Sequence, residues 1–196
     1  KAINDFDAAI KAKPDYAYAY NDRGSAKVKL EKYEEAASDY KMAVKISPTM
    51  AFAYNNLGSV KKKLKDYRGA IEEYTVAVKM NSDYFIAYNN RGTAYFELED
   101  YQNAIKDYDK AIELNPQYYY AYNNRANAKY KINDYESALA DYTKAIELNP
   151  NYGYAYLNRG ITYEMLKNPL KSCEDWKQAA LLGISTAASY TSMQCK

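Results

Sequence analysis

The chain contains no histidine among its 196 residues, and this absence removes the commonest general base and a frequent zinc ligand. It has two cysteines and no CxxC pair, so the sequence indicates neither a zinc site nor a thiol redox site. Phosphate-binding loop motifs and the H-E-x-x-H pattern are also absent. The sequence therefore predicts a protein that is not an enzyme, with no metal site and no cofactor.

Long apolar runs are absent as well. No stretch approaches the roughly 18 apolar residues that would indicate a transmembrane helix, so we expect no membrane insertion. The 27 Lys and Arg residues nearly balance the 25 Asp and Glu residues. Because no basic stripe is present, the sequence argues against nucleic acid as a partner. The compartment is not determined by the sequence, and the cytoplasm is the one we favour.

Tyrosine is the residue type in excess. The chain has 25 Tyr against 4 Phe and 1 Trp. A tyrosine ring offers a large contact area with a polar tip, which suits both thin, half-exposed cores and binding surfaces.

The sequence is organised by a repeat of 34 residues. A six-residue phrase recurs at this spacing as AYNDRG (19–24), AYNNLG (53–58), AYNNRG (87–92), AYNNRA (121–126) and AYLNRG (155–160). A fixed period of this length is typical of repeat architectures. Within one unit, Ala104, Tyr108, Ala111 and Ile112 follow a helical spacing. Each unit is therefore predicted to be a helix–turn–helix pair, at 84–98 and 101–114 in the third copy.

Small residues recur at matching positions of the two predicted helices. Glycine inside a helix costs about 1 kcal/mol relative to alanine, so its recurrence implies a close approach between backbones. We expect the glycine column of the first helix to pack against the alanine column of the second helix. The first column is Gly24, Gly58, Gly92, Ala126 and Gly160, and the second is Ala36, Ala70, Ala104 and Ala138.

These columns, with Pro14, Pro48, Pro116 and Pro150 on the same grid, resemble the tetratricopeptide repeat (TPR) family. The resemblance implies an all-α, right-handed superhelical solenoid whose first helices line a concave, peptide-binding groove. It implies a single array over 1–196: a half repeat (1–16), full repeats at 17–50, 51–84, 85–118, 119–152 and 153–186, and a C-terminal capping helix at 187–196. The opening residues read as the middle of a repeat, so we expect a fragment of a longer protein.

The fifth repeat departs from the pattern. Pro169 stands where the earlier copies have tyrosine, and proline is tolerated in the first turn of a helix. Cys173 and Cys195 fall in the last second helix and in the cap. We expect two buried free thiols, with a disulfide that pins the cap as the alternative.

An arginine column and an acidic column vary together. The arginine is lost only at Leu57, in the one repeat where the aspartate becomes Glu73. We therefore predict structural Arg–Asp ion pairs, within a helix pair or to a neighbouring one, because a partly buried arginine needs a carboxylate. Binding of a phosphate or carboxylate by these arginines is the alternative. The predicted pairs are Arg23–Asp39, Arg91–Asp107, Arg125–Asp141 and Arg159–Asp175.

Asparagine recurs after the core tyrosine although it is a poor helix former. The TPR resemblance implies that these positions face the groove, where amides could hold an extended peptide by its backbone. The alternative is that the amides join adjacent repeats or face water. The candidate peptide-binding residues are Asn21, Asn55, Asn56, Asn89, Asn90, Asn123 and Asn124, with Phe52, Tyr120 and Tyr154 as apolar contacts.

The predicted function is a non-catalytic scaffold that binds a protein or peptide partner in its groove. The lysine-bearing carboxylate clamp of chaperone-binding TPR proteins is absent, because those positions hold Asn21, Asn55, Asn89 and apolar residues. Two alternatives remain. Residues 1–16 expose Phe6 and Ile10, which favours self-assembly into a homo-oligomer through this half repeat. The array could also be the regulatory arm of a larger enzyme.

Overall fold

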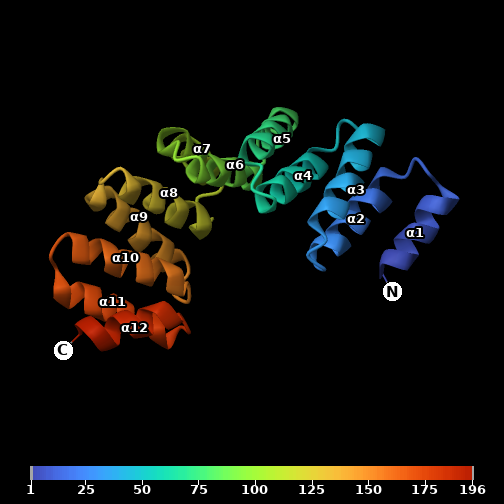
Figure 1. Ribbon diagram of the computed structural model, residues 1–196. Helices are drawn as coiled ribbons and strands as arrows, with labels where there is room; N and C mark the ends of the chain where they lie inside the picture. The colour runs from blue at the N-terminus through green and yellow to red at the C-terminus, as the bar shows by residue number, and fades with distance from the viewer. Residues whose placement is uncertain (1, 196) are drawn as a thin grey trace. The chain divides into compact units, whose positions relative to one another are not determined.

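The computed structural model describes residues 2–195, and every regular element in them is an α-helix (Figure 1). The all-α fold class predicted from the sequence is confirmed. The helices are α1 (Ala2–Ala12), α2 (Ala17–Val28), α3 (Tyr33–Ile46), α4 (Ala51–Lys63), α5 (Tyr67–Met80), α6 (Phe85–Glu97), α7 (Tyr101–Leu114), α8 (Tyr119–Lys131), α9 (Tyr135–Leu148), α10 (Gly153–Met165), α11 (Pro169–Leu181) and α12 (Ser185–Gln194).

The chain divides into two compact units. Unit 1 comprises residues 1–99 with α1 to α6, and unit 2 comprises residues 100–196 with α7 to α12. Within each unit, consecutive helices pack as antiparallel neighbours in the manner of helix hairpins. The first helices of adjacent repeats also lie side by side: α2 contacts α4, and α4 contacts α6, in unit 1, while α8 contacts α10 in unit 2.

The turn inside each repeat has a fixed chemistry. One residue in each turn has a positive φ, at Glu31, Lys65, Glu99, Asn133 and Lys167. In the first repeat the next amide, Lys32 N–H, donates back to the Lys27 carbonyl at 3.0 Å, which is the long hydrogen bond of a Schellman ending. The second helix then starts at a side-chain cap in several repeats, such as Asp66, whose carboxylate accepts from Gly69 N–H at 3.0 Å.

The last repeat follows the same plan. Pro169 is the first residue of α11, as expected, and the Asn168 side chain caps this helix by accepting from Lys171 N–H at 3.3 Å. The capping helix begins at Ser185, two residues before its predicted start, and the structure describes it to Gln194. Residue 196 of the predicted cap lies outside the described residues.

The predicted packing between the two columns of small residues occurs in the fourth repeat, where Ala126 and Ala138 share one buried cluster. The nearest neighbours of the glycines in the first two repeats are tyrosine rings. A Cβ on Gly24 would lie 2.9 Å from Cε1 of Tyr40, and one on Gly58 would lie 2.8 Å from Cε1 of Tyr74. The small residue thus makes room for the flat face of an aromatic ring on the second helix. Ala36 is fully buried and shares a cluster with Leu57 of the next repeat. At Gly24 and Gly58 the absent side chain leaves room for the ring, whereas the fourth repeat holds Ala126 beside Tyr142 at the same position.

The two cysteines are joined. Cys173 of α11 and Cys195, which follows α12, form a disulfide with Cα atoms 5.5 Å apart, so the expectation of two free thiols is wrong. The bond fastens a helix that buries only Ala187. Trp176, Leu157 and Ala179 form the apolar surface beneath it.

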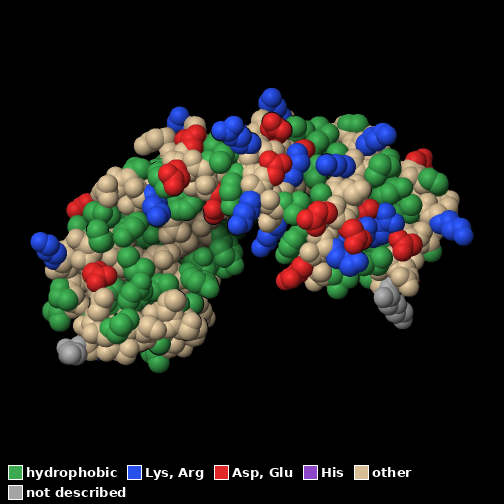
Figure 2. Space-filling model, viewed as in Figure 1, with side chains coloured by type: hydrophobic (Ala, Val, Ile, Leu, Met, Phe, Trp, Pro, Cys, Tyr) green, Lys and Arg blue, Asp and Glu red, His purple; other side chains and the backbone are tan. Residues whose placement is uncertain are grey.

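Charged side chains are spread over the visible face of unit 1, while few lie over α10 to α12 on the same view (Figure 2). Across residues 2–195, no helix has both the length and the hydropathy needed to cross a bilayer. The same residues contain no group of three side chains suited to hold a metal ion.

Candidate functional site

The arginine of the repeat phrase connects three helices. Arg23 on α2 donates from Nε and Nη2 to the carboxylate of Asp39 on α3, at 2.9 and 2.6 Å. Its Nη1 donates to Asp7 on α1 at 2.7 Å. The guanidinium also lies over the ring of Tyr20, 5.4 Å from its centroid. Both arrangements considered from the sequence, a pair within a repeat and a contact to a neighbour, therefore occur at one residue.

Unit 2 repeats this geometry. Arg125 donates to Asp141 at 2.8 and 2.6 Å and to Asp109 on the preceding second helix at 2.6 Å. Arg159 donates to Asp175 at 2.8 and 2.7 Å and to Thr143 at 3.0 Å. Two of the predicted residues, Arg91 and Asp107, belong to different units.

The charge of these arginines is fixed by their partners. The hydrogen bond to Asp39 raises the pKa of Arg23 above its ordinary value, against the opposing effect of burial. Burial also opposes the charge of Arg125, yet hydrogen bonds to Asp141 and Asp109 leave its pKa raised. Each of these two arginines donates through Nε, Nη1 and Nη2 to carboxylates on two other helices, and so links three helices.

The second repeat lacks the Arg–Asp ion pair and is stabilised by other contacts. Leu57 replaces the arginine and packs with Ala36, Tyr40 and Val60. Its acidic partner position, Glu73, accepts from Lys61 at 2.6 Å. Apolar contacts of Leu57 and an ion pair between Lys61 and Glu73 thus replace the Arg–Asp ion pair.

The asparagines of unit 1 form a ladder between adjacent repeats. Asn56 Nδ2 on α4 donates to Asn21 Oδ1 on α2 at 3.0 Å. Asn90 Nδ2 on α6 donates to Asn55 Oδ1 on α4, also at 3.0 Å. The second asparagine of one phrase therefore binds the first asparagine of the preceding phrase. The alternative function considered for these amides, joining adjacent repeats, accounts for these two hydrogen bonds.

Unit 2 departs from this pattern at one residue. Asn127 stands where unit 1 has Ser25 and Ser59, and its longer side chain accepts from Asn158 Nδ2 at 3.1 Å. The same oxygen accepts from the hydroxyl of Tyr142 at 2.6 Å. Asn123 Oδ1, the acceptor that Asn158 would use in the unit 1 pattern, has no hydrogen-bond partner and is buried.

Burial separates the two asparagines of each phrase. The first asparagines are at most 6% exposed, so their amides face neighbouring helices rather than solvent: Asn21, Asn55, Asn89 and Asn123. The second asparagines are half-buried: Asn56, Asn90 and Asn124. Among the apolar candidates, Tyr120 and Tyr154 are 42% and 57% exposed, and Phe52 is half-buried. Of the candidate residues named from the sequence, the second asparagines and the aromatic rings are therefore the ones that reach solvent.

Sequence reasoning missed three neighbours of these rings. Tyr118, Tyr119 and Tyr152 form a continuous group with Tyr120 and Tyr154. The run YYYAY at 118–122 was the available signal, because three consecutive tyrosines at a helix start cannot all point into the core.

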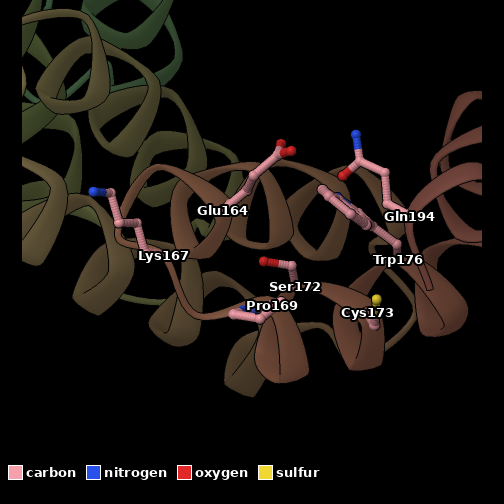
Figure 3. Close-up of a pocket in the computed structure, with 7 residues that line it drawn as sticks. All are labelled: Glu164, Lys167, Pro169, Ser172, Cys173, Trp176 and Gln194. Carbon is pink, nitrogen blue, oxygen red and sulfur yellow. The ribbon is translucent and has the colours of Figure 1, made fainter. Parts of the chain in front are cut away.

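A cavity of about 360 Å³ lies between α10, α11 and α12 in unit 2 (Figure 3). Glu164, Lys167 and Gln194 stand at its sides, and Trp176 and Ser172 lie deeper. The indole N–H of Trp176 is buried without an acceptor. Ile161 explains this, because it stands where Ser25 and Ser59 offer a hydroxyl to the corresponding tyrosine.

Models of known protein families match most of the chain. Models of the tetratricopeptide repeat match residues 85–118 and 119–152, and further TPR models match 24–65, 53–84 and 141–174. The chain belongs to the tetratricopeptide repeat family. A search of curated protein sequences finds no match to this chain.

Solved structures of TPR proteins share the fold. The crystal structure of YrrB, described as a TPR protein with an unusual peptide-binding site, is 22% identical with a TM-score of 0.72 and covers 96% of this chain and 98% of its own. MamA is 25% identical with a TM-score of 0.74, and the match covers 84% of this chain and 96% of MamA. PilF from Pseudomonas aeruginosa is 21% identical with a TM-score of 0.79, covering 86% and 77%.

The TPR assignment gives the coarse function. The repeats and their structural relatives support a protein–protein interaction scaffold, and the family is generally non-catalytic. This agrees with a candidate site built from amides and aromatic rings.

Proposed function

We propose that the first helices of each unit bind an extended peptide segment of a partner protein. The observation that supports this proposal most directly is the state of the second asparagines. Asn56 and Asn90 are half-buried, and each uses one Nδ2 hydrogen in the ladder. An amide has two donor hydrogens and an acceptor oxygen, so one donor and one acceptor of each remain for a ligand.

These groups suit a peptide backbone. An extended chain presents alternating N–H and C=O groups, and an amide can pair with one of each. The ladder bonds hold the side chains of Asn56 and Asn90 in position before a ligand arrives, which lowers the entropy cost of binding. Asn21 and Asn55 serve this proposal as buried supports that orient the contacting amides.

Binding to selected peptides tests the proposal. A library of random twelve-residue peptides displayed on phage is panned against the immobilised chain, and a recovered peptide is titrated by fluorescence anisotropy. We expect the double variant Asn56→Ala, Asn90→Ala to bind about thirtyfold more weakly, since two hydrogen bonds of about 1 kcal/mol each are lost. The control variant Lys110→Ala changes a half-buried side chain of a second helix and should bind like the original chain.

Circular dichroism of each variant distinguishes lost contacts from lost folding. The proposal fails if the double variant keeps its helical signal and binds the peptide with unchanged affinity. It also fails if Lys110→Ala weakens binding as much as the asparagine changes do.

Self-assembly remains a second candidate because of one observation in unit 1. Helix α1 buries none of its residues, and Ile3 and Phe6 line a cavity of about 670 Å³ with Ala26 and Leu30. An uncovered apolar edge of this kind favours association with another helix. Sedimentation analysis from 1 to about 100 μM tests it, because a mass that stays at one chain throughout excludes this assembly at working concentrations.

A further inference from the structure

One half-buried lysine of unit 1 has no carboxylate partner. Among residues 2–195, five lysines are half-buried, and four of them lie 2.6 to 2.8 Å from a carboxylate oxygen: Lys27, Lys61, Lys110 and Lys129. The fifth is Lys62, and no carboxylate in these residues lies within ion-pair distance of its ammonium group. Lys62 is therefore partly removed from solvent without the counter-ion that the other four lysines have.

Lys62 lies in the last turn of α4, on the side of the helix that faces α6. It follows Asn55 by seven residues, which is two helical turns, so the two side chains leave the same side of α4. Asn55 Oδ1 accepts from Asn90 Nδ2 of α6, which identifies that side. Carbonyl groups at a helix C-terminus carry partial negative charge and favour an ammonium group there. The helix end thus favours the charge of Lys62 but supplies no counter-ion.

Neighbouring charges leave the ammonium group of Lys62 uncompensated. Burial lowers the pKa of Lys62, while Glu97 of α6 opposes this effect and Lys63 adds to it. Glu97 is exposed and forms no ion pair with Lys62. A partly buried cation without a carboxylate is costly to the fold, and such groups are found at functional sites. An ammonium group has three donor hydrogens, so Lys62 has donors to offer to a partner.

Lys62 and the amides of the proposed binding surface lie along one seam, which is the contact between α4 and α6. Seven residues of α-helix advance about 10 Å, so Lys62 lies about 10 Å along α4 from the hydrogen bond between Asn90 and Asn55. About three residues of an extended peptide cover the same length. One bound segment can therefore reach Asn90 with its backbone and Lys62 with a side chain.

We propose that Lys62 binds the carboxylate of an aspartate or glutamate side chain in the partner peptide. A carboxylate supplies the opposite charge and accepts hydrogen bonds from the ammonium group. Lys62 is not one of the carboxylate-clamp positions, which hold asparagine or apolar residues in this chain. The inference rests on the proposed function, because it names one residue that a peptide bound to unit 1 contains.

The composition of selected peptides tests the inference. Random twelve-residue peptides are fused to the phage coat protein through their C-termini, so that they carry no free C-terminal carboxylate. Peptides recovered on the original chain should contain Asp or Glu more often than the unselected library. Lys62→Gln should remove this enrichment, and Lys62→Glu should enrich Lys and Arg instead. The matched control is Lys63→Gln, which removes the same charge from the exposed neighbour and should keep the enrichment.

Affinities give the second measurement. A recovered peptide is synthesised with an amidated C-terminus, together with an analogue in which its Asp or Glu is replaced by Asn or Gln. Fluorescence anisotropy should show the analogue binding about tenfold more weakly to the original chain and to Lys63→Gln, because Lys62 is left unpaired in the complex. On Lys62→Gln the two peptides should bind equally. Circular dichroism confirms that each variant is folded.

Several outcomes would overturn the inference. Selected peptides with no excess of Asp or Glu would do so. An analogue that loses the same affinity on Lys62→Gln as on the original chain would mean that the acid meets another cation. An equal loss of enrichment in Lys63→Gln would mean that binding follows net charge alone. If selected peptides depend on Asn56 and Asn90 without an acidic preference, this inference fails and the proposed function stands; if no peptide is recovered, both fail.

Discussion

Arg125 and Asp141 form a two-pronged ion pair in which Nε and Nη2 of the arginine reach separate carboxylate oxygens at 2.8 and 2.6 Å. Lys129 adds a third contact to the same carboxylate at 2.8 Å. The aspartate thus compensates two cations, whereas the arginine also pairs with Asp109. This asymmetry decides what the two residues contribute to stability.

We expect Asp141→Ala to destabilise the fold more than Arg125→Leu. The first change leaves two partly buried cations without their shared carboxylate, which costs about 3–5 kcal/mol. The second leaves Asp141 paired with Lys129, as Glu73 is paired with Lys61 beside Leu57. Urea unfolding followed by circular dichroism measures both changes, and a larger loss in Arg125→Leu would contradict the asymmetry.

Alkaline pH should weaken unit 1 through Tyr74. Burial raises the pKa of Tyr74 to about 12, although its hydroxyl donates to Ser59. In the unfolded chain the phenol ionises near pH 10. Between about pH 10 and 12 the unfolded state therefore loses a proton that the folded state keeps, and the free energy of unfolding falls by about 1.4 kcal/mol per pH unit.

Tyr74→Phe serves as the control for this effect. The variant has no phenol to ionise, so its free energy of unfolding should fall less steeply above pH 10. Urea midpoints at pH 9, 10 and 11 give the comparison. Parallel curves for the two proteins would show that Tyr74 does not carry the dependence.

Reduction of the disulfide should expose Trp176. This residue is 1% exposed and stacks on Tyr190 of α12, with centroids 5.0 Å apart. Closing a loop of this length stabilises a fold by about 3 kcal/mol, and Ala187 is the one residue that α12 buries even with the bond in place. Because the chain has one tryptophan, a red-shifted emission and faster iodide quenching under reducing agent report the release directly.

A serine substitution controls for effects of the reductant itself. Cys173→Ser should show the shifted emission with and without reducing agent. An emission spectrum that reductant leaves unchanged in the original chain would mean that packing alone holds α12.

Exchanging glycine and alanine in the glycine column should cost different amounts of stability in different repeats. A Cβ on Gly58 would lie 2.8 Å from the Tyr74 ring, so Gly58→Ala should lose about 1–3 kcal/mol despite better helix propensity. Ala126 already occupies the equivalent position and is buried with Tyr142. Ala126→Gly should therefore cost only about 1 kcal/mol, from propensity alone. Thermal unfolding of both variants tests the difference, and a stabilised Gly58→Ala would contradict it.

The repeat could be predicted because several independent sequence signals indicate the same structure. The 34-residue spacing, the helical spacing within each unit and Asn115–Pro116 at a helix end all agree, and the helix bounds follow within about two residues. Pro169 was also interpretable, since proline has few tolerated positions in a helix.

The partners of individual side chains were harder to predict. The glycines could have faced alanines or rings, and only the three-dimensional path of the helices places Gly24 against Tyr40. The burial of Asn55 was likewise hidden, because the sequence shows a polar residue without showing that Asn90 supplies its hydrogen bond. Pairing of Cys173 with Cys195 depends on where α12 returns, which the spacing of two cysteines does not fix.

The side-chain oxygen of Asn127 links a buried hydroxyl to a half-buried amide, because it accepts a hydrogen bond from each. In unit 1 the buried tyrosine and the surface amide use separate acceptors: Tyr40 bonds with Ser25, and Asn56 binds Asn21. In unit 2 the hydroxyl of Tyr142 and the amide of Asn158 meet on one atom. The half-buried amide of Asn158 and the buried hydroxyl of Tyr142 therefore compete for the lone pairs of a single oxygen. A change at Asn127 would thus alter a core hydrogen bond and an inter-repeat hydrogen bond together, whereas in unit 1 the two belong to different residues.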